Sequence, residues 1–211
     1  IGLVHRLDRP TGGLLVFAKT SKSASRLSEQ IKNGEFDKKY LTVVVGQPKD
    51  RTKKLEHFLK KDEKTNIVKI VPQTESGAKK AELIYEVIDT YNEYIEIHRE
   101  PKTRTRIDQH EDLSQTEKVE DNEIKMEKKI INTLSLVEIE LLTGRSHQIR
   151  VQMASLKTPV YGDVKYGEIK DDNKTINLAL WAYKLSFIHP TTKQLMSFKA
   201  LPDMENEPWT K

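Results

Sequence analysis

Hydrophobic and polar residues are patterned along this chain in a way that predicts many strands and few helices. The β-branched run at residues 39–45 is typical of a strand, and the turn residues that start at Gly46 end it. Residues 14–18 are continuously apolar, which predicts a central strand. Further strands are expected at residues 81–88, 94–97 and 133–142.

Two segments have the apolar spacing of helices. Residues 23–31 carry apolar side chains every three or four positions, and Gly34 is expected to end this helix. Residues 146–156 also place their apolar side chains on one helical face, and Ser146 is the expected N-cap. With the two C-terminal strands described next, at least seven strands are expected, against only two or three helices.

The C-terminal strands are expected to pair as a hairpin. Residues 182–188 and 194–200 flank a short turn, and the alternation in 133–142 changes phase between Leu136 and Val137, which indicates a bulge. Short links between strands are unlike the steady strand–helix alternation of a parallel sheet. We therefore expect an α+β fold with a largely antiparallel mixed β-sheet and a few flanking helices.

Residues 99–130 interrupt this pattern. Seventeen of these 32 residues are charged, eight positively and nine negatively, and there is no aromatic residue or glycine. Such a segment buries too little apolar area to offset its ordering entropy. We expect a charged, mobile insertion between two strands, with a charged surface helix at residues 117–129 as the alternative.

Composition and charge narrow the class of protein. Apolar residues make up 36% of the 211 residues, and the chain has no cysteine, which excludes disulfide scaffolds and thiolate chemistry. No apolar run reaches the ~20 residues of a membrane helix. The net charge is only +4, but basic residues are in excess within residues 1–60, which fits either a phosphate-rich partner or a solvated lysine-rich surface.

The first residues predict an incomplete domain. Residues 1–4 (IGLV) read as the middle of a strand and contain no methionine. We expect a single domain over residues 1–211 that lacks its N-terminal part. A monomer in a reducing, cytoplasmic compartment is compatible with the cysteine-free composition.

Asp8 is a candidate for chemistry because it lies between Arg6 and Arg9, beside a Gly-Gly turn. The structural alternative is a turn aspartate that bonds to nearby backbone. The functional alternative is a nucleophile or base that needs a neighbouring cation to stay ionised.

Two further segments carry candidate chemistry. The segment 144–150 (GRSHQIR) joins a glycine turn to a helix start and places Arg150 inside the helix, as either a solvated or a carboxylate-paired side chain. Tyr40 follows Lys38 and Lys39, a combination that suits phosphate contact and base stacking, although a tyrosine at a strand start is usually a packing residue. The six histidines show no metal-ligand spacing, so no metal is expected.

Four ordered motifs resemble those of RluA-family pseudouridine synthases. Residues 5–14 (HRLDRPTGGL) are similar to the family signature HRLDxxT[SG]GL, and Lys39-Tyr40 with the strand to Gly46 is similar to its tyrosine motif. Residues 142–150 (LTGRSHQIR) resemble its third motif, and residues 159–167 (PVYGDVKYG) resemble PxxGDxxYG. Four matches in the family's order are far more specific than any one motif.

The resemblance implies the pseudouridine synthase catalytic fold and a role for each matching residue. Asp8 matches the essential aspartate, Tyr40 the tyrosine that stacks on the target base, and Arg150 the basic residue that pairs with the aspartate. Arg6 matches an arginine associated with the space left by the flipped base. The implied activity is isomerisation of uridine to pseudouridine in structured RNA, ribosomal ahead of transfer RNA, without metal or organic cofactor.

The chain departs from the family pattern at three positions. Gly12 stands where many members have Ser, and Gln152 stands where His is common. Leu180-Trp181-Ala182 replaces a frequent leucine-histidine-alanine, so Trp181 stands in the place of the histidine. None of these is one of the four candidate site residues. The alternative to an isomerase is a non-catalytic RNA-binding module that keeps the fold.

Overall fold

A computed structural model describes residues 1–99, 125–167, 177–205 and 209 of the chain. The chain divides into two compact units, each described here by itself. The first comprises Ile1–Tyr91 and Thr133–Lys211, and the second Asn92–Asn132. Every candidate site residue belongs to the first unit.

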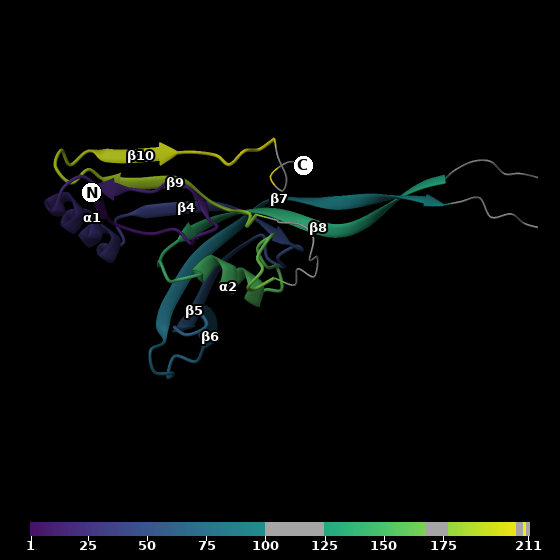
Figure 1. The fold of residues 1–211 in the computed structure, drawn as a ribbon, viewed down its shortest axis with the longest axis horizontal. Helices are drawn as coiled ribbons and strands as arrows, with labels where there is room; N and C mark the ends of the chain where they lie inside the picture. The colour runs from purple at the N-terminus through teal and green to yellow at the C-terminus, as the bar shows by residue number, and fades with distance from the viewer. Residues whose placement is uncertain (100–124, 168–176, 206–208, 210–211) are drawn as a thin grey trace, which may run out of the picture. The chain divides into compact units, whose positions relative to one another are not determined.

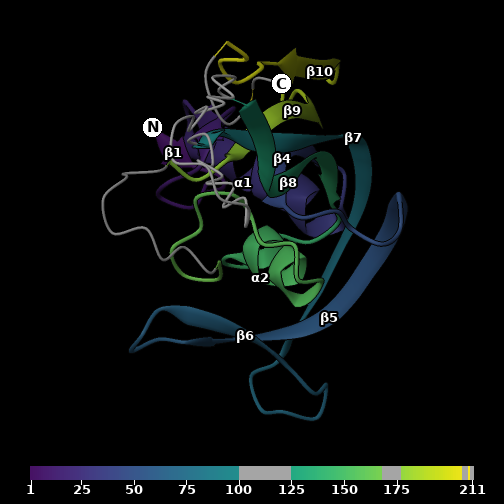
Figure 2. The ribbon, with the colours of Figure 1, turned by 90° about the vertical axis from the view of Figure 1, so that its right-hand side faces the viewer.

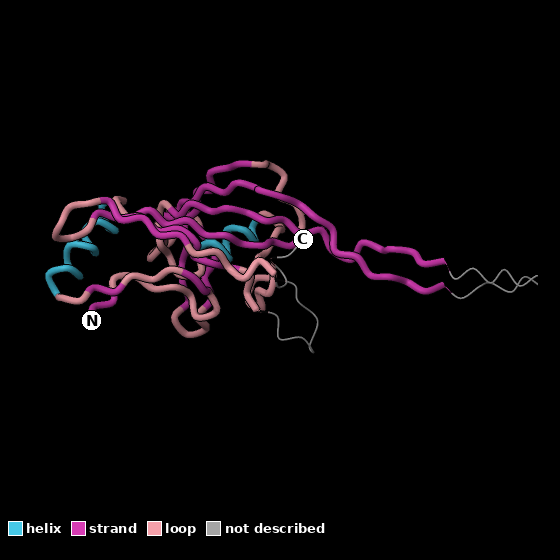
Figure 3. Tube along the Cα trace, turned by 90° about the horizontal axis from the view of Figure 1, so that it is seen from above, coloured by secondary structure: helices cyan, strands magenta, loops and turns pink. Residues whose placement is uncertain are grey.

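The first unit is built around a twisted sheet with the strand order β10-β9-β4-β8-β7-β5-β6. In Figure 1, β10, β9 and β4 run side by side, and Figure 3 shows far more strand than helix in the described chain. The strands are β1 (Gly2–Leu3), β2 (Gly12–Gly13), β3 (Phe17–Ala18), β4 (Asp37–Val45), β5 (Thr52–Asp62), β6 (Ile67–Val71), β7 (Lys79–Arg99), β8 (Lys125–Leu141), β9 (Leu180–Ile188) and β10 (Leu195–Lys199). β4 pairs antiparallel with both β8 and β9, whereas the short β2 runs parallel to β9. The predicted α+β class with a largely antiparallel sheet is confirmed.

Helix α1 (Ser21–Asn33) forms where the apolar spacing predicts it. Thr20 Oγ1 accepts a hydrogen bond from the Ser23 backbone N–H and caps the start. Gly34 ends the helix with φ 75°, a left-handed conformation that glycine adopts without steric cost. The apolar face of α1 packs against Phe36 and Phe187 at one end of the sheet.

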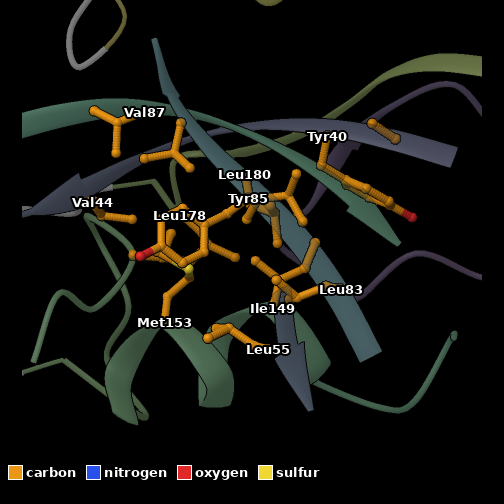
Figure 4. Close-up of a cluster of buried hydrophobic side chains, with 14 residues drawn as sticks. Tyr40, Val44, Leu55, Leu83, Tyr85, Val87, Ile149, Met153, Leu178 and Leu180 are labelled. Carbon is orange, nitrogen blue, oxygen red and sulfur yellow. The ribbon is translucent and has the colours of Figure 1, made fainter. Parts of the chain in front are cut away.

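Helix α2 (Gln148–Ser155) lies within the curve of the sheet, with β5 and β6 on the opposite side from β9 and β10 (Figure 2). Residues 148–153 are all buried, so this helix meets solvent only at its C-terminal end. Ile149 and Met153 join the main core, where they pack among side chains of β4, β7 and β8 (Figure 4). The expected Ser146 N-cap is wrong: His147 is the N-cap residue, with φ 52° and no side-chain capping bond.

Three strand predictions need correction. The expected strand at residues 14–18 is mostly irregular: only Phe17–Ala18 form a strand, and Leu14 and Val16 are partly buried against the α1 cluster. The strands expected at 81–88 and 94–97 form one continuous strand, β7. The expected bulge between Leu136 and Val137 does not occur in their pairing with β4, which is regular; the register shifts between Lys39 and Tyr40, opposite β9.

The second unit contains the end of β7 and the start of β8, where Asn132 donates a hydrogen bond to Glu93 (2.7 Å). Residues 100–124 of the expected insertion lie outside the described residues. The surface helix expected at 117–129 is wrong for residues 125–129, which belong to β8; the remainder also lies outside the described part.

Candidate active site

A cavity of about 1030 Å³ opens in the first unit. Its walls come from the N-terminal segment, the end of α1, the start of β4, the β5–β6 turn and the link from β8 to α2. Three of the four sequence-predicted site residues line it: Arg6, Asp8 and Tyr40. The fourth, Arg150, lies behind the wall and contacts Asp8.

Asp8 is held in a tight turn at the cavity. The Thr11 backbone N–H donates to the Asp8 carbonyl (2.8 Å), so the turn is closed by the backbone and the carboxylate is not used. The Asp8 side chain is 25% exposed. The turn therefore presents the carboxylate to the cavity, which favours the functional alternative over the structural one.

The two glycines after this turn allow it to lie against β9. Gly12 and Gly13 pair with Trp181 and Ala182. Gly13 has φ 112°, and a Cβ atom there would lie 2.3 Å from the Ala182 carbonyl oxygen. Any larger residue at position 13 would push the Asp8 turn away from the sheet.

Gly12 and Trp181, two of the three departures from the family pattern, are in direct steric contact. A Cβ atom on Gly12 would lie 2.3 Å from Cζ3 and 2.5 Å from Cε3 of the Trp181 ring. Trp181 Nε1 donates to the Ala200 carbonyl (2.9 Å), which holds the ring in this place. The tryptophan at 181 thus requires glycine at 12, and the two departures are one structural adjustment.

Arg150 links Asp8 to a second, fully buried carboxylate. Its Nη1 atom lies 3.8 Å from Asp8 Oδ2. Its Nε and Nη2 atoms donate to the two carboxylate oxygens of Asp163 at 2.7 and 2.6 Å. Arg150 is only 4% exposed and Asp163 not at all, so the bidentate pair neutralises an arginine charge that would otherwise be costly to bury.

Sequence reasoning missed Asp163 as the principal partner of Arg150. The signal was its place in the PVYGD segment, where an acid follows a glycine turn. Asp163 Oδ1 also accepts the backbone N–H groups of Lys165 and Tyr166 at 2.9 and 3.1 Å. Asp163 therefore fixes both its own turn and the arginine.

Tyr40 lies at the edge of the main core with its hydroxyl directed away from the other side chains (Figure 4). Burial, reinforced by the negative charge of Asp8, raises the pKa of the Tyr40 hydroxyl to about 12. The phenol is therefore neutral at physiological pH beside the carboxylate.

His147, which lines the cavity, and Tyr166 lie close to Asp8 and Arg150. The Tyr166 hydroxyl lies 2.7 Å from His147 Nδ1 and accepts the Val68 backbone N–H at 2.9 Å. The Arg150 guanidinium carbon lies 5.2 Å from the centre of the Tyr166 ring, in cation–π geometry. Burial lowers the pKa of His147, while the Asp8 charge opposes that shift.

Arg6 is exposed at the cavity and also lines a smaller neighbouring cavity of about 340 Å³ with Lys61, Lys79 and Arg145. These positively charged side chains extend the basic surface of the site from Arg6 toward β5. Within the described ranges, no group of three or more His, Asp or Glu side chains could hold a metal ion, and no helix is long and apolar enough to cross a membrane.

Comparison with known proteins agrees with this geometry. A family model described as RNA pseudouridylate synthase matches residues 1–155. The chain belongs to the RNA pseudouridylate synthase family. The predicted resemblance to RluA-type enzymes is confirmed, and the predicted class of enzyme, an isomerase of uridine in RNA, is the class of this family.

Individual relatives act on different RNAs by name. The tRNA pseudouridine synthase C of Haemophilus ducreyi is 28% identical over 96% of this chain and 72% of its own. The ribosomal large subunit pseudouridine synthase C of Haemophilus influenzae is 30% identical over 95% of this chain and 51% of its own. The chain thus spans about half the length of several relatives that it matches.

A solved structure confirms the fold. Human RNA Pseudouridylate Synthase Domain Containing 1 superposes with a TM-score of 0.65 over 99% of this chain and 71% of that one, at 21% identity.

Proposed function

We propose that this protein isomerises uridine to pseudouridine in structured RNA, with Asp8 as the reacting carboxylate. The observation that carries the proposal is one cavity that holds Asp8 and Tyr40, with Arg150 3.8 Å behind the acid. We further propose ribosomal RNA ahead of transfer RNA as the substrate; the names of relatives include both kinds.

The target uridine must leave its stack to enter the cavity, at a cost of a few kcal/mol that is smallest in loops and bulges. Stacking on Tyr40 offsets about 1–3 kcal/mol of that cost. Arg6, at the exposed rim, is placed to interact with the RNA that the base leaves.

In the reaction the N1–C1′ bond breaks, the uracil turns, and a C5–C1′ bond forms. The proton on C5 is lost and N1 gains one, so no oxidant, reductant or cofactor is consumed. Asp8 acts either as a nucleophile at the sugar C1′ or as a base at C2′. Both roles use the carboxylate form of Asp8, and the positive charge of Arg150 lies 3.8 Å from it.

Release of tritium tests the proposal. Transcripts of ribosomal and transfer RNA labelled with tritium at uracil C5 are incubated with the full-length protein. We expect release from wild type and from the control Asp37→Asn, an exposed acid at the start of β4, and none from Asp8→Asn. RNA binding without release from any protein would instead identify a non-catalytic RNA-binding module.

The RNA class is tested by mapping pseudouridine in cells that lack the protein. We expect a ribosomal uridine to remain unmodified. Loss confined to transfer RNA would refute the proposed preference. The monomeric state and the cytoplasmic location stay predictions.

A further inference from the structure

Lys38 and Lys39 are adjacent on β4 but point to opposite faces of the sheet. Side chains alternate along a strand, so Lys38 lies on the same face as Tyr40. Lys38 and Tyr40 both line the cavity, and Lys39 does not. The lysine pair before the tyrosine therefore contributes one cation to the cavity and one to the other face.

Lys39 has a structural partner on its own face. Its Nζ atom lies 2.6 Å from Glu138 Oε1 on β8, and Glu138 also accepts a hydrogen bond from the Tyr183 hydroxyl. This pairing raises the pKa of Lys39. The charge of Lys39 is thus balanced within the fold.

Lys38 has no such balance. Across the described part of the chain, no side chain or carbonyl forms a hydrogen bond or ion pair with its Nζ atom. The ammonium lies against the Gly144 turn, where a Cβ atom on the glycine would be 3.5 Å from Nζ. Burial lowers the pKa of Lys38, as expected for a cation that has lost water without gaining an anion.

The groups around Lys38 do not provide that anion. The charge of Lys38 contributes, after burial, to a pKa of about 4 for His5, so His5 is neutral beside it at physiological pH. Asp8 lines the same cavity, but its ion pair is with Arg150. A partly buried ammonium that faces a cavity without a counter-ion is suited to bind an anionic ligand there.

We propose that Lys38 binds a phosphate of the RNA backbone beside the target uridine, in a subsite formed with the Gly144 turn. The inference rests on the proposed function and deepens it. Tyr40, two residues along the same face of β4, would stack the base, so one strand would contact both the base and the backbone. Because Gly144 has no side chain, the backbone of its turn lies open to Lys38 Nζ.

The dependence of RNA affinity on salt tests this subsite. Full-length wild type, Lys38→Met, Lys38→Arg and the matched control Lys39→Met are titrated with a fluorescein-labelled 12-nucleotide oligouridylate at several salt concentrations. A lost phosphate contact on a single strand reduces the slope of log K against log salt by about 0.7. We expect that reduction, with about tenfold weaker binding at low salt, for Lys38→Met alone, and recovery in Lys38→Arg.

Thermal unfolding separates binding from a structural role. Lys38→Met is expected to keep the wild-type Tm, because it removes an unpaired buried charge, whereas Lys39→Met is expected to lower it by leaving Glu138 unpaired. A lower Tm with an unchanged salt slope for Lys38→Met would overturn the proposal. If wild type neither binds oligouridylate nor releases tritium, the proposed function itself fails; normal binding and turnover with an unchanged slope overturns the role of Lys38 alone.

Discussion

Replacing Asp163 by asparagine should separate the structural role of Arg150 from its role at Asp8. Asparagine keeps the shape of the side chain and an oxygen for the two backbone N–H groups that Asp163 binds. It removes the charge that faces Arg150 through bonds of 2.6 and 2.7 Å. The nearest remaining carboxylate, Asp8, is 3.8 Å away and a quarter exposed.

Breaking a buried ion pair from one side costs about 3–5 kcal/mol, because the other charge stays buried without compensation. We expect about 3 kcal/mol for Asp163→Asn, since Asp8 still offers Arg150 partial compensation, and a similar loss for Arg150→Met. The double variant removes both charges and should lie within about 2 kcal/mol of wild type, since neutral replacement of a buried pair is often tolerated.

Urea unfolding followed by tryptophan fluorescence measures these free energies. Asp50→Asn, which breaks an exposed pair with Lys53, is the control and should cause no measurable loss. Additive losses in the double variant would refute the description of Arg150 and Asp163 as one buried pair.

Activity of the double variant then isolates the catalytic contribution. The double variant is expected to fold and yet to release tritium at least about 100-fold more slowly than wild type. The reason is that Asp8 loses Arg150, its only ion-pair partner within the described residues 1–99, 125–167 and 177–205. Wild-type release from the double variant would show that Arg150 serves only the fold.

Three further outcomes are expected. Gly12→Ser should lose about 1–3 kcal/mol of unfolding free energy because its Cβ overlaps the Trp181 ring, and adding Trp181→His should restore much of that loss, as urea titrations will show. Tyr166→Phe removes the hydroxyl bonded to His147 and to the Val68 backbone N–H and should cost about 1–3 kcal/mol in the same titration, while tritium release stays close to wild type because the ring that faces Arg150 is kept. Burial, with the Lys38 charge, lowers the pKa of His5 to about 4, so the folded state resists protonation that the unfolded state accepts. The resulting stability is complete above pH 6.5 and is lost as the pH falls toward 4; thermal unfolding against pH should show a smaller loss for His5→Gln.

The local pattern of apolar and polar residues predicted the helices and strands whose buried face can be identified from a few neighbouring residues. The run at 39–45 became β4, and the helix ending at Gly34 became α1. The apolar run at 14–18 was misassigned as a strand. An apolar run predicts that its residues are covered, but it does not show whether a helix or a sheet covers them. There the covering element is a helix, α1.

The long strand β7 was not predictable because its middle is polar. The sequence Asp-Thr-Tyr-Asn at residues 89–92 reads as a turn. In the structure Thr90 Oγ1 lies 3.1 Å from Ser135 Oγ on β8, so a cross-strand partner satisfies the polar side chain and the strand continues. That partner is 45 residues away along the chain.

The candidate site shows the same limit. The motif resemblance identified Asp8, Tyr40 and Arg150, although about 140 residues separate the first from the last, and the fold brings all three to one cavity and its wall. The residues alone gave Arg150 two interpretations, solvated or paired. The choice depended on residues 148–153 of α2 all being buried, which the one-sided spacing of its apolar residues did not indicate.

The geometry of Arg150 explains why one arginine needs two acids. Asp163 occupies the edge formed by Nε and Nη2, which fixes the guanidinium plane and leaves Nη1 toward Asp8. At 3.8 Å, Nη1 provides positive charge near Asp8 without the close hydrogen bond that would hold its carboxylate in place. A carboxylate that lies near a positive charge and yet is free to approach a sugar carbon or its proton fits either proposed role. In the proposed reaction, Asp163 would therefore act as a positioning residue, through the arginine that it holds.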